Sequence, residues 1–504
     1  MKKVTNVFYI TLALITMAVL FGVIVPEQYE TATENIQSFI LTNFGWYYLL
    51  IMAAFVLVSL IIALSPYGRI RLGKDTDRPD FSTVTWVAML FSAGMGIGLV
   101  FYGAAEPLTH YVVNPPTEEP GTEAALKDSL VSTYLHWGVP PWAMYGLTAL
   151  ALAFFQFRKN EPGLISATMK PIFGDKMNGP LGIAVDVLAV FATAFGVASS
   201  LGFGAVQING GLNHLFGVEV GFAAQFAIIS VVTVLFMISA WTGLSKGIKY
   251  LSNTNMVLAV LLLIFVVIVG PTLMILNLFT DTLGTHFQNL IQLSFRSAPL
   301  SGDNRSFVEG WTIFYWAWWI SWAPFVGMFI ARISRGRTIR EFLLVVIFVP
   351  TLFSTFWFAS FGTTAAHVQD TAMDLSGLAS ELVLFNVFEH LPLSIILSGI
   401  AILLIASFFI TSADSATFVL GIQSTNGSLT PPNQVKLIWG ITQSGIAALL
   451  LYVGGLQAIQ NTIIIAALPF SIILILMTYS TFKALKQERH RMEELAKGKI
   501  TRNK

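Results

Sequence analysis

Long stretches without a charged side chain constrain this sequence more than any other feature. A helix needs about 20 apolar residues to cross the hydrocarbon core of a bilayer. Stretches of that length recur along the chain. They lie between Lys3 and Glu27, Glu34 and Arg69, Asp80 and Glu106, Asp128 and Arg158, Asp186 and Glu219, Glu219 and Lys246, Lys249 and Asp281, Glu309 and Arg332, Glu341 and Asp370, Glu389 and Lys436, and Lys436 and Lys483. The last has 46 residues, too many for one crossing, and we divide it at Gly454-Gly455. The sequence therefore predicts an all-α membrane protein with twelve transmembrane helices.

The composition excludes several classes of function. Only 11% of the residues are charged, against about 25% in an average soluble domain. The net charge of +1 provides no basic field for nucleic acid, and the absence of Cys excludes disulfide scaffolds and thiolate metal sites. The seven His residues are scattered and form no ligand-like pair, and no nucleophile–base pair is visible. We expect neither an enzyme nor a nucleic-acid-binding protein.

The distribution of basic residues predicts the orientation in the membrane. Cytoplasmic loops of membrane proteins are enriched in Lys and Arg. With the N-terminus in the cytoplasm, 25 of the 28 Lys and Arg residues fall on the cytoplasmic side. We therefore expect both termini in the cytoplasm. The first apolar stretch is long and no small-residue cleavage site follows it, so we expect a retained helix rather than a signal peptide.

Three glycines interrupt the third predicted helix at alternate positions, Gly94, Gly96 and Gly98. Each costs about 1 kcal/mol relative to Ala inside a helix. Close packing of neighbouring helices is one explanation, because Gly94 and Gly98 have the spacing of a small-xxx-small motif. Local unwinding is the other, and unwound segments in transporters present bare carbonyls to cations. The glycines alone leave both interpretations open.

Tryptophans in the eighth predicted helix lie at an unusual depth. Trp in membrane proteins usually lies at the headgroup level. Trp318 and Trp319 follow the start of their uncharged stretch by eight or nine residues, which places them about 12 Å deep at 1.5 Å per residue. Trp322 lies one turn further along on the face of Trp318. These rings either fill the core or form a ligand site near the middle of the membrane.

The fourth predicted helix carries a second set of deep aromatic residues. Trp142 and Tyr145 lie 14 and 17 residues after Asp128 and share one helix face. Pro140-Pro141 separates them from Trp137 and predicts a bend in the helix. An aromatic box attracts cations, and a quaternary ammonium group is its usual ligand because that group cannot donate hydrogen bonds. Because few acidic residues lie within the membrane, we expect a zwitterion that carries its own negative charge.

The tenth predicted helix carries hydroxyl groups and an acidic residue in the order Thr411, Ser412, Ala413, Asp414. Hydroxyls inside membrane helices often bond only to the carbonyl four residues earlier. An acidic residue within the membrane is expensive and functional by default. Two adjacent hydroxyls opposite the carbonyls of an unwound glycine segment would form an oxygen site, the kind that hard cations such as Na⁺ prefer.

Five segments together resemble the betaine/choline/carnitine transporter family. The segments match in order and spacing and are 91–107 (FSAGMGIGLVFYGAAEP), 136–145 (HWGVPPWAMY), 316–325 (WAWWISWAPF), 331–337 (ARISRGR) and 410–416 (ITSADSA). The likeness is greatest to glycine betaine carriers of Gram-positive bacteria. It implies an inverted-repeat, leucine-transporter-like core. In that arrangement residues 1–80 form peripheral helices, 81–300 the first five-helix repeat, 301–482 the second repeat and 483–504 a basic cytoplasmic tail.

The resemblance also implies which residues bind the substrate and the ions. The box around the trimethylammonium group would consist of Trp137, Trp142, Tyr145 and Trp319, bordered by Met95 and Gly98, with Trp318 and Trp322 on the way to the cytoplasm. One sodium ion would be bound by carbonyls of Ser92, Met95 and Phe408 and by hydroxyls of Thr411 and Ser412. A second would use Thr193, Tyr145 and Phe325.

Three positions bear on the coupling ion. The second sodium site of the family has a Thr where this chain has Val197, so the ligands of that site are in question. Proton-coupled members carry an acidic residue at the position of Gly98, and sodium-independent exchangers carry an Arg at the position aligned with Asn255. The absence of an acidic residue at position 98 and the absence of an Arg at position 255 both favour sodium as the coupling ion. An inward-moving positive charge gains about 2.3 kcal/mol per 100 mV of membrane potential. Two sodium ions carried with a neutral zwitterion would therefore support roughly thousandfold accumulation of the zwitterion per 100 mV.

The expected function is sodium-coupled uptake of glycine betaine as an osmoprotectant across the bacterial cell membrane. The alternatives are uptake of choline, carnitine or proline betaine, or an osmosensor that does not transport. A channel is not expected because the middle of the membrane is aromatic and closed. The tail from Lys483 to Lys504 is either a solvated helix or a segment that binds anionic lipid and senses ionic strength. Trimers occur in the family.

Overall fold

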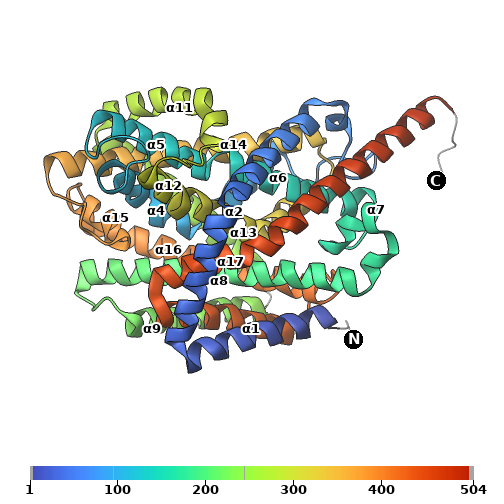
Figure 1. The fold of residues 1–504 in the computed structure, drawn as a ribbon, viewed down its shortest axis with the longest axis horizontal. Helices are drawn as coiled ribbons and strands as arrows, with labels where there is room; N and C mark the ends of the chain where they lie inside the picture. Colours follow the sequence, from blue (N-terminus) through green and yellow to red (C-terminus); the bar gives the residue numbers. More distant parts are fainter. Residues whose placement is uncertain (1–3, 95, 243–244, 499–504) are drawn as a thin grey trace.

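Apolar helices make up almost the whole molecule, as the uncharged stretches predict. The computed structural model describes residues 4–94, 96–242 and 245–498 (Figure 1). Within these ranges no strand occurs, apart from an isolated bridge between Arg71 and Thr338. The predicted fold class, an all-α membrane protein, is therefore confirmed.

The helices follow one another with short connections. The α-helices are α1 (Asn6–Ile24), α2 (Pro26–Leu64), α3 (Thr83–Gly94), α4 (Ile97–Leu108), α5 (Glu123–Trp137), α6 (Val139–Ala153), α7 (Lys170–Phe173), α8 (Pro180–Phe216), α9 (Phe222–Thr242), α10 (Ser245–Val269), α11 (Thr272–Ser294), α12 (Gly302–Phe307), α13 (Phe314–Ile333), α14 (Ile339–Thr371), α15 (Ser380–Glu389), α16 (Ser394–Ser424) and α17 (Asn433–Ala496). Short 3₁₀ segments are η1 (Pro66–Arg69), η4 (Ser166–Met169) and η5 (Gly174–Asn178), and π-helical turns are η2 (Thr109–Val113), η3 (Phe154–Arg158) and η6 (Val308–Ile313).

Ten helical segments of the described chain are long and apolar enough to cross a membrane, against the twelve predicted. The difference arises at two glycine-rich breaks. The third predicted helix is divided into α3 and α4, each of 12 residues and too short to count alone. The helix α17 instead runs across two predicted crossings, with non-helical backbone at Gly454 and Gly455. Gly455 has φ +60°, a conformation that favours glycine.

The break between α3 and α4 decides how the glycines of the third predicted helix act. Gly96 has extended backbone, with φ −149° and ψ −177°, directly before the first turn of α4. Local unwinding is therefore confirmed. Met95 lies outside the described residues.

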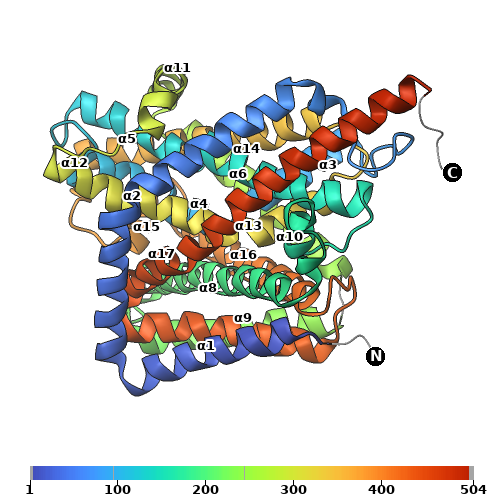
Figure 2. The same cartoon turned by 45° about the vertical axis from the view of Figure 1, so that its right-hand side comes forward.

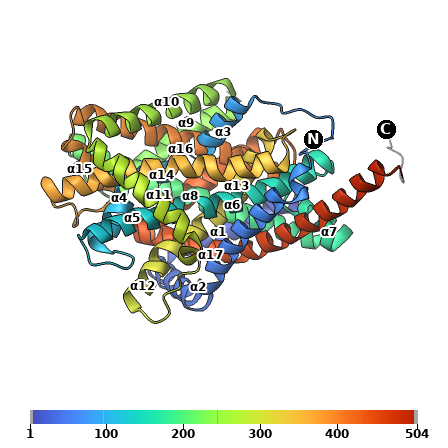
Figure 3. The ribbon, with the colours of Figure 1, turned by 90° about the horizontal axis from the view of Figure 1, so that it is seen from above.

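The helices surround α8, which lies near the centre of the bundle (Figure 2). It packs against α4, α13, α16 and α17. Helix α9 lies at the periphery, where Val231, Val234 and Ile238 are more than half exposed, whereas every residue of α6 is buried. Apolar exposure on outer helices is what a lipid environment requires. The start of α1 and the end of α17 lie at the same end of the bundle (Figures 1 and 3).

The basic C-terminal segment continues α17 as far as Ala496. Its Glu488 is fully buried and pairs with Arg158 at 2.9 Å, with Lys159 and with Arg491. Arg158 is itself only 3% exposed and also donates to Asp75 at 2.8 Å. A fully solvated helix is therefore wrong for this turn of the tail, which packs on the loops near residues 73 and 158. Lipid binding by the later basic residues stays a prediction.

Candidate substrate-binding site

All six aromatic residues predicted for the substrate pathway line one cavity, next to the break between α3 and α4. Its lining residues are Gly96, Ile97, Gly98, Leu99, Trp137, Pro141, Trp142, Tyr145, Ser200, Trp318, Trp319, Trp322, Val326, Pro350, Phe353 and Ser354. None of these described residues is charged. The sequence analysis did not predict that α14 lines the cavity through Pro350, Phe353 and Ser354, because no motif in the sequence distinguishes these residues.

The proline pair between α5 and α6 explains how the box is assembled. Pro140-Pro141 has no N–H groups, so the carbonyls of His136 and Trp137, four residues earlier, lose their helical donors. Trp319 of α13 supplies one replacement, because its Nε1 donates to the His136 carbonyl at 2.8 Å. The hydroxyl of Ser354 in α14 lies 3.1 Å from the Trp137 carbonyl and 2.7 Å from the Pro350 carbonyl of its own helix, and its single proton serves one of the two. The predicted bend therefore connects α5 to two other helices.

The aromatic rings of the box are in direct contact. Trp318 and Trp319 stack with centroids 5.0 Å apart and an angle of 8°. Trp137 meets Trp319 edge to face at 4.9 Å, and Trp142 meets Tyr145 in the same way at 5.6 Å. The centroids of Tyr145 and Trp319 are 6.4 Å apart, which links the two pairs. Five of the six predicted aromatic residues are therefore brought together, each 8% exposed or less, and the sixth, Trp322, is partly buried.

Gly98 lies against two of these rings. A Cβ atom at this position would lie 2.7 Å from Cη2 of Trp318 and 2.9 Å from Cη2 of Trp137. Since carbon pairs pack best at about 3.5–4.0 Å, any side chain here would displace an indole. The close-packing interpretation of the glycines thus holds at Gly98, the second residue of α4, next to the break at Gly96.

The residues predicted for the first sodium ion lie partly outside the described part of the chain. This applies to Met95 and to the side chain of Ser92. Phe408 and Thr411 are buried in α16, where the Thr411 hydroxyl donates to the Ser407 carbonyl at 3.0 Å. The intrahelical bond is therefore present, and sodium ligation by Thr411 stays a prediction.

Helix α16 nevertheless faces the region of the break. A Cβ on Gly204 of α8 would touch both Ile97, the first residue of α4, and Phe409 of α16. Ser412 is half-buried. Asp414 is buried, and its carboxylate accepts a long bond of 3.4 Å from Ser239.

The residues predicted for the second sodium ion lie on helices that pack together. Gly196 of α8 accepts a hydrogen bond of 2.6 Å from Nε1 of Trp322 on α13. Thr193 and Phe325 each lie three residues from this contact. Both are buried, as is Val197. The hydroxyl of Thr193 donates to its own helix, at the Ala189 carbonyl 2.8 Å away, so this site also stays a prediction.

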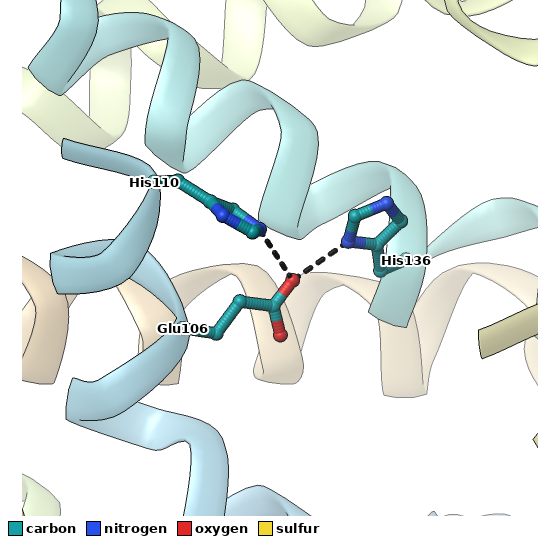
Figure 4. Close-up of side chains that lie close together, drawn as sticks. All are labelled: Glu106, His110 and His136. Atoms are coloured by element: carbon teal, nitrogen blue, oxygen red, sulfur yellow. Dashed lines mark hydrogen bonds and ion pairs between the residues drawn. The ribbon is translucent and has the colours of Figure 1, made fainter. Parts of the chain in front are cut away.

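A buried polar cluster behind the box was not predicted. Glu106 of α4 accepts from Trp137 Nε1 at 2.7 Å and from Tyr315 Oη at 2.5 Å. Its other carboxylate oxygen lies 2.7 Å from His136 Nδ1 and 3.3 Å from His110 Nε2 (Figure 4). The sequence shows no ligand-like pair of His residues, but the structure brings His110 and His136 to the same carboxylate. The spacing of Glu106 and His110, one helical turn, could have indicated part of the cluster.

The family follows from comparison with known proteins. The profile of the BCCT family, the betaine/carnitine/choline family transporters, matches residues 6–490. The chain belongs to this family. As a BCCT protein it is a multi-pass membrane transporter and not an enzyme, and the resemblance noted in its motifs is confirmed.

Three BCCT relatives illustrate the range of substrates. The glycine betaine transporter OpuD of Bacillus subtilis is 54% identical over 498 residues, covering 99% of this chain and 97% of that protein. A probable glycine betaine transporter of Desulfitobacterium hafniense is 42% identical, covering 97% and 98%. An ectoine/hydroxyectoine transporter of Virgibacillus pantothenticus is also 42% identical, with the same coverage.

Proposed function

We propose that this BCCT protein takes up glycine betaine together with sodium ions, as an osmoprotectant of a bacterial cell. The observation that carries the proposal is the cavity lined by five indoles and a tyrosine, without a carboxylate among its described lining residues. A trimethylammonium group cannot donate hydrogen bonds, so ring faces are its best partners. A primary amine would instead need several hydrogen-bond acceptors, and this mostly apolar lining has few of them.

The polar atoms of the cavity suit the other end of a zwitterion. Tyr145 Oη, Ser200 Oγ and Trp318 Nε1 are buried and have no hydrogen-bond partner among the described residues. Buried polar groups are nearly always paired in folded proteins. All three can donate, and a ligand carboxylate would satisfy them. We infer that the betaine carboxylate accepts a hydrogen bond from at least one of these groups.

Sodium coupling is supported by the sequence of α16 and by the helix break opposite it. Thr411 and Ser412 carry adjacent hydroxyls, and a broken helix offers carbonyls without helical donors. Val197 supplies no oxygen to the second predicted site, so one coupling ion is the minimum that we propose. Transport by alternating access would involve the two predicted repeats, 81–300 and 301–482.

Orientation and assembly are part of the same proposal. The start of α1 and the end of α17 lie at one end of the bundle, and the excess of basic residues in the loops assigned to the cytoplasm supports a cytoplasmic location for that end. The later basic residues of the tail would meet anionic lipid, each contributing about 1 kcal/mol. Assembly as a trimer is proposed from the family resemblance alone.

The test is uptake into liposomes containing the purified protein. Labelled glycine betaine, choline, carnitine, proline betaine and ectoine are each supplied with an inward sodium gradient and, separately, with potassium. We expect concentrative uptake of glycine betaine only with sodium. Preferred uptake of ectoine or of another quaternary amine would redirect the substrate assignment, and binding without uptake would identify a sensor.

One substitution tests the aromatic box. Trp319→Leu should abolish betaine accumulation because it removes the ring that contacts Trp137, Trp318 and Tyr145. The cation–π contribution of such a ring reaches about 2 kcal/mol when it is desolvated. Trp316→Leu is the matched control. Trp316 is equally buried on the same helix but does not line the cavity. Equal loss of uptake in both variants, or normal uptake by Trp319→Leu, would contradict the assignment.

A further inference from the structure

We propose that Glu106 is a positioning residue that both fixes the Trp137 indole and strengthens its attraction for a cationic headgroup. This inference rests on the proposed function, since it assigns a source of the selectivity of the same aromatic box. Glu106 is fully buried on α4 and is not among the described residues that line the cavity. It therefore acts through Trp137, whose ring borders the cavity while its N–H points to the carboxylate.

The carboxylate is surrounded by hydrogen-bonding groups on both oxygens. Trp137 Nε1 and Tyr315 Oη donate to Oε2, at 2.7 and 2.5 Å. His136 Nδ1 and His110 Nε2 lie 2.7 and 3.3 Å from Oε1. An ionised carboxylate accepts at all of these positions, whereas a protonated one would give up an acceptor site. The arrangement thus suits the negative form of Glu106.

The histidine beside the box completes a consistent proton arrangement. If His136 donates through Nδ1 to Glu106, its Nε2 is an acceptor, and Thr312 Oγ1 lies 3.0 Å from it and can donate. The backbone carbonyl of His136 accepts from Trp319 at 2.8 Å. Two indoles of the box are therefore held next to His136. Trp319 donates to the His136 carbonyl, and Trp137 donates to the Glu106 carboxylate, which the His136 ring also contacts.

The charge of Glu106 has a consequence beyond geometry. A hydrogen bond to an ionised acceptor is stronger than a neutral one and polarises the donor. The Trp137 N–H bond to a carboxylate shifts electron density into the indole ring. A more negative ring face attracts a cation more strongly, because the cation–π interaction is electrostatic. The effect depends on the charge of the headgroup and should vanish for a neutral headgroup of the same shape.

A metal site is the competing interpretation of the cluster. One ligand atom each from Glu106, His110 and His136 lies within 4.8 Å of the other two. An ion there would break the bonds between the carboxylate and both imidazoles. The carboxylate already has hydrogen-bonding partners on both oxygens, including the short bond from Tyr315. The hydrogen-bonded arrangement explains every contact of Glu106 without an ion.

The experiment compares two ligands of equal shape and different headgroup charge. Glycine betaine and its carbon analogue 3,3-dimethylbutanoate share a carboxylate, and only the first has a positive headgroup. Binding to the purified full chain is measured by tryptophan fluorescence and by competition with labelled betaine. For Glu106→Gln we expect betaine binding to weaken about tenfold and binding of the analogue to change less than twofold. In transport, KM should rise with kcat nearly unchanged.

Conservative variants separate charge from structure. Glu106→Asp keeps the charge and should retain the preference for betaine over the analogue better than Glu106→Gln. Equal weakening of both ligands in Glu106→Gln would reduce Glu106 to a structural role and overturn the proposal, as would unchanged betaine binding. Zn²⁺ inhibition that His110→Ala abolishes would also overturn it, in favour of a metal site.

The two proposals fail differently. If Trp319→Leu retains betaine uptake, the aromatic box itself is wrong and the proposed function fails. If Trp319→Leu abolishes uptake while Glu106→Gln keeps the wild-type preference for betaine, only the role of Glu106 fails.

Discussion

Replacing Gly98 by Ala tests how tightly the broken helix and the aromatic box are fitted to each other. The new methyl group would lie 2.7 Å from one ring atom of Trp318 and 2.9 Å from one of Trp137. Optimal carbon contacts are about 3.5–4.0 Å, so each ring would have to move by roughly 0.6–1.3 Å. Neither ring moves freely, because Trp318 stacks on Trp319 and Trp137 is bonded to Glu106.

The expected cost follows from overpacking in a filled core. An extra methyl group in such a core costs about 1–3 kcal/mol. Since 1.4 kcal/mol corresponds to tenfold in a binding constant, the range is about 5- to 150-fold. Both rings line the cavity, so we expect Gly98→Ala to weaken betaine binding by at least about fivefold, with a smaller loss of thermal stability.

The assay is betaine binding and uptake by Gly98→Ala, with Gly399→Ala as the control. Gly399 lies inside α16 and has no atom within 4 Å of a built Cβ, so its substitution should leave binding unchanged. Adding Trp318→Phe to Gly98→Ala removes the nearest ring atom and should recover part of the loss. Wild-type affinity and stability in Gly98→Ala alone would refute the fit between the glycine and the two indoles.

Two further predictions concern the ion and the tail. The double variant Thr411→Ala, Ser412→Ala should raise the sodium concentration for half-maximal uptake at least about tenfold, because a desolvated ion that loses two oxygen ligands is costly to bury. Betaine binding should weaken with it by linkage. Unchanged sodium dependence in a betaine titration would place the ion elsewhere. Deleting residues 492–504 keeps the Glu488–Arg158 pair and should shift the osmolality dependence of uptake in anionic-lipid liposomes. Deletion from Lys486 onward should also lower thermal stability, since it removes one partner of this buried ion pair. An unchanged dependence of uptake on osmolality after the shorter deletion would argue against lipid sensing.

The sequence by itself determined the features that depend on local physics. Uncharged stretches specify membrane helices because a lipid environment tolerates few charges. The glycines at 94–98 and 454–455 mark positions where a break is possible, because glycine destabilises a helix. Several glycines lie inside α8 without breaking it, so the packed structure decided where the breaks occur. The proline pair specifies a bend because its missing N–H groups are a property of the residue. The motifs around the deep tryptophans were sufficient to indicate the family and the aromatic box.

Tertiary structure alone decided which partners these local features acquired. The His136 carbonyl released by Pro140 is satisfied by Trp319, and the Trp137 carbonyl released by Pro141 lies beside Ser354. These partners are about 180 and 220 residues further along the chain. Glu106 meets His136 across 30 residues and Tyr315 across 209. No periodicity or spacing encodes such pairs, because they depend on how α4, α5 and α13 pack. A buried carboxylate requires donors, and only the packed helices determine that one of them is the indole of the box.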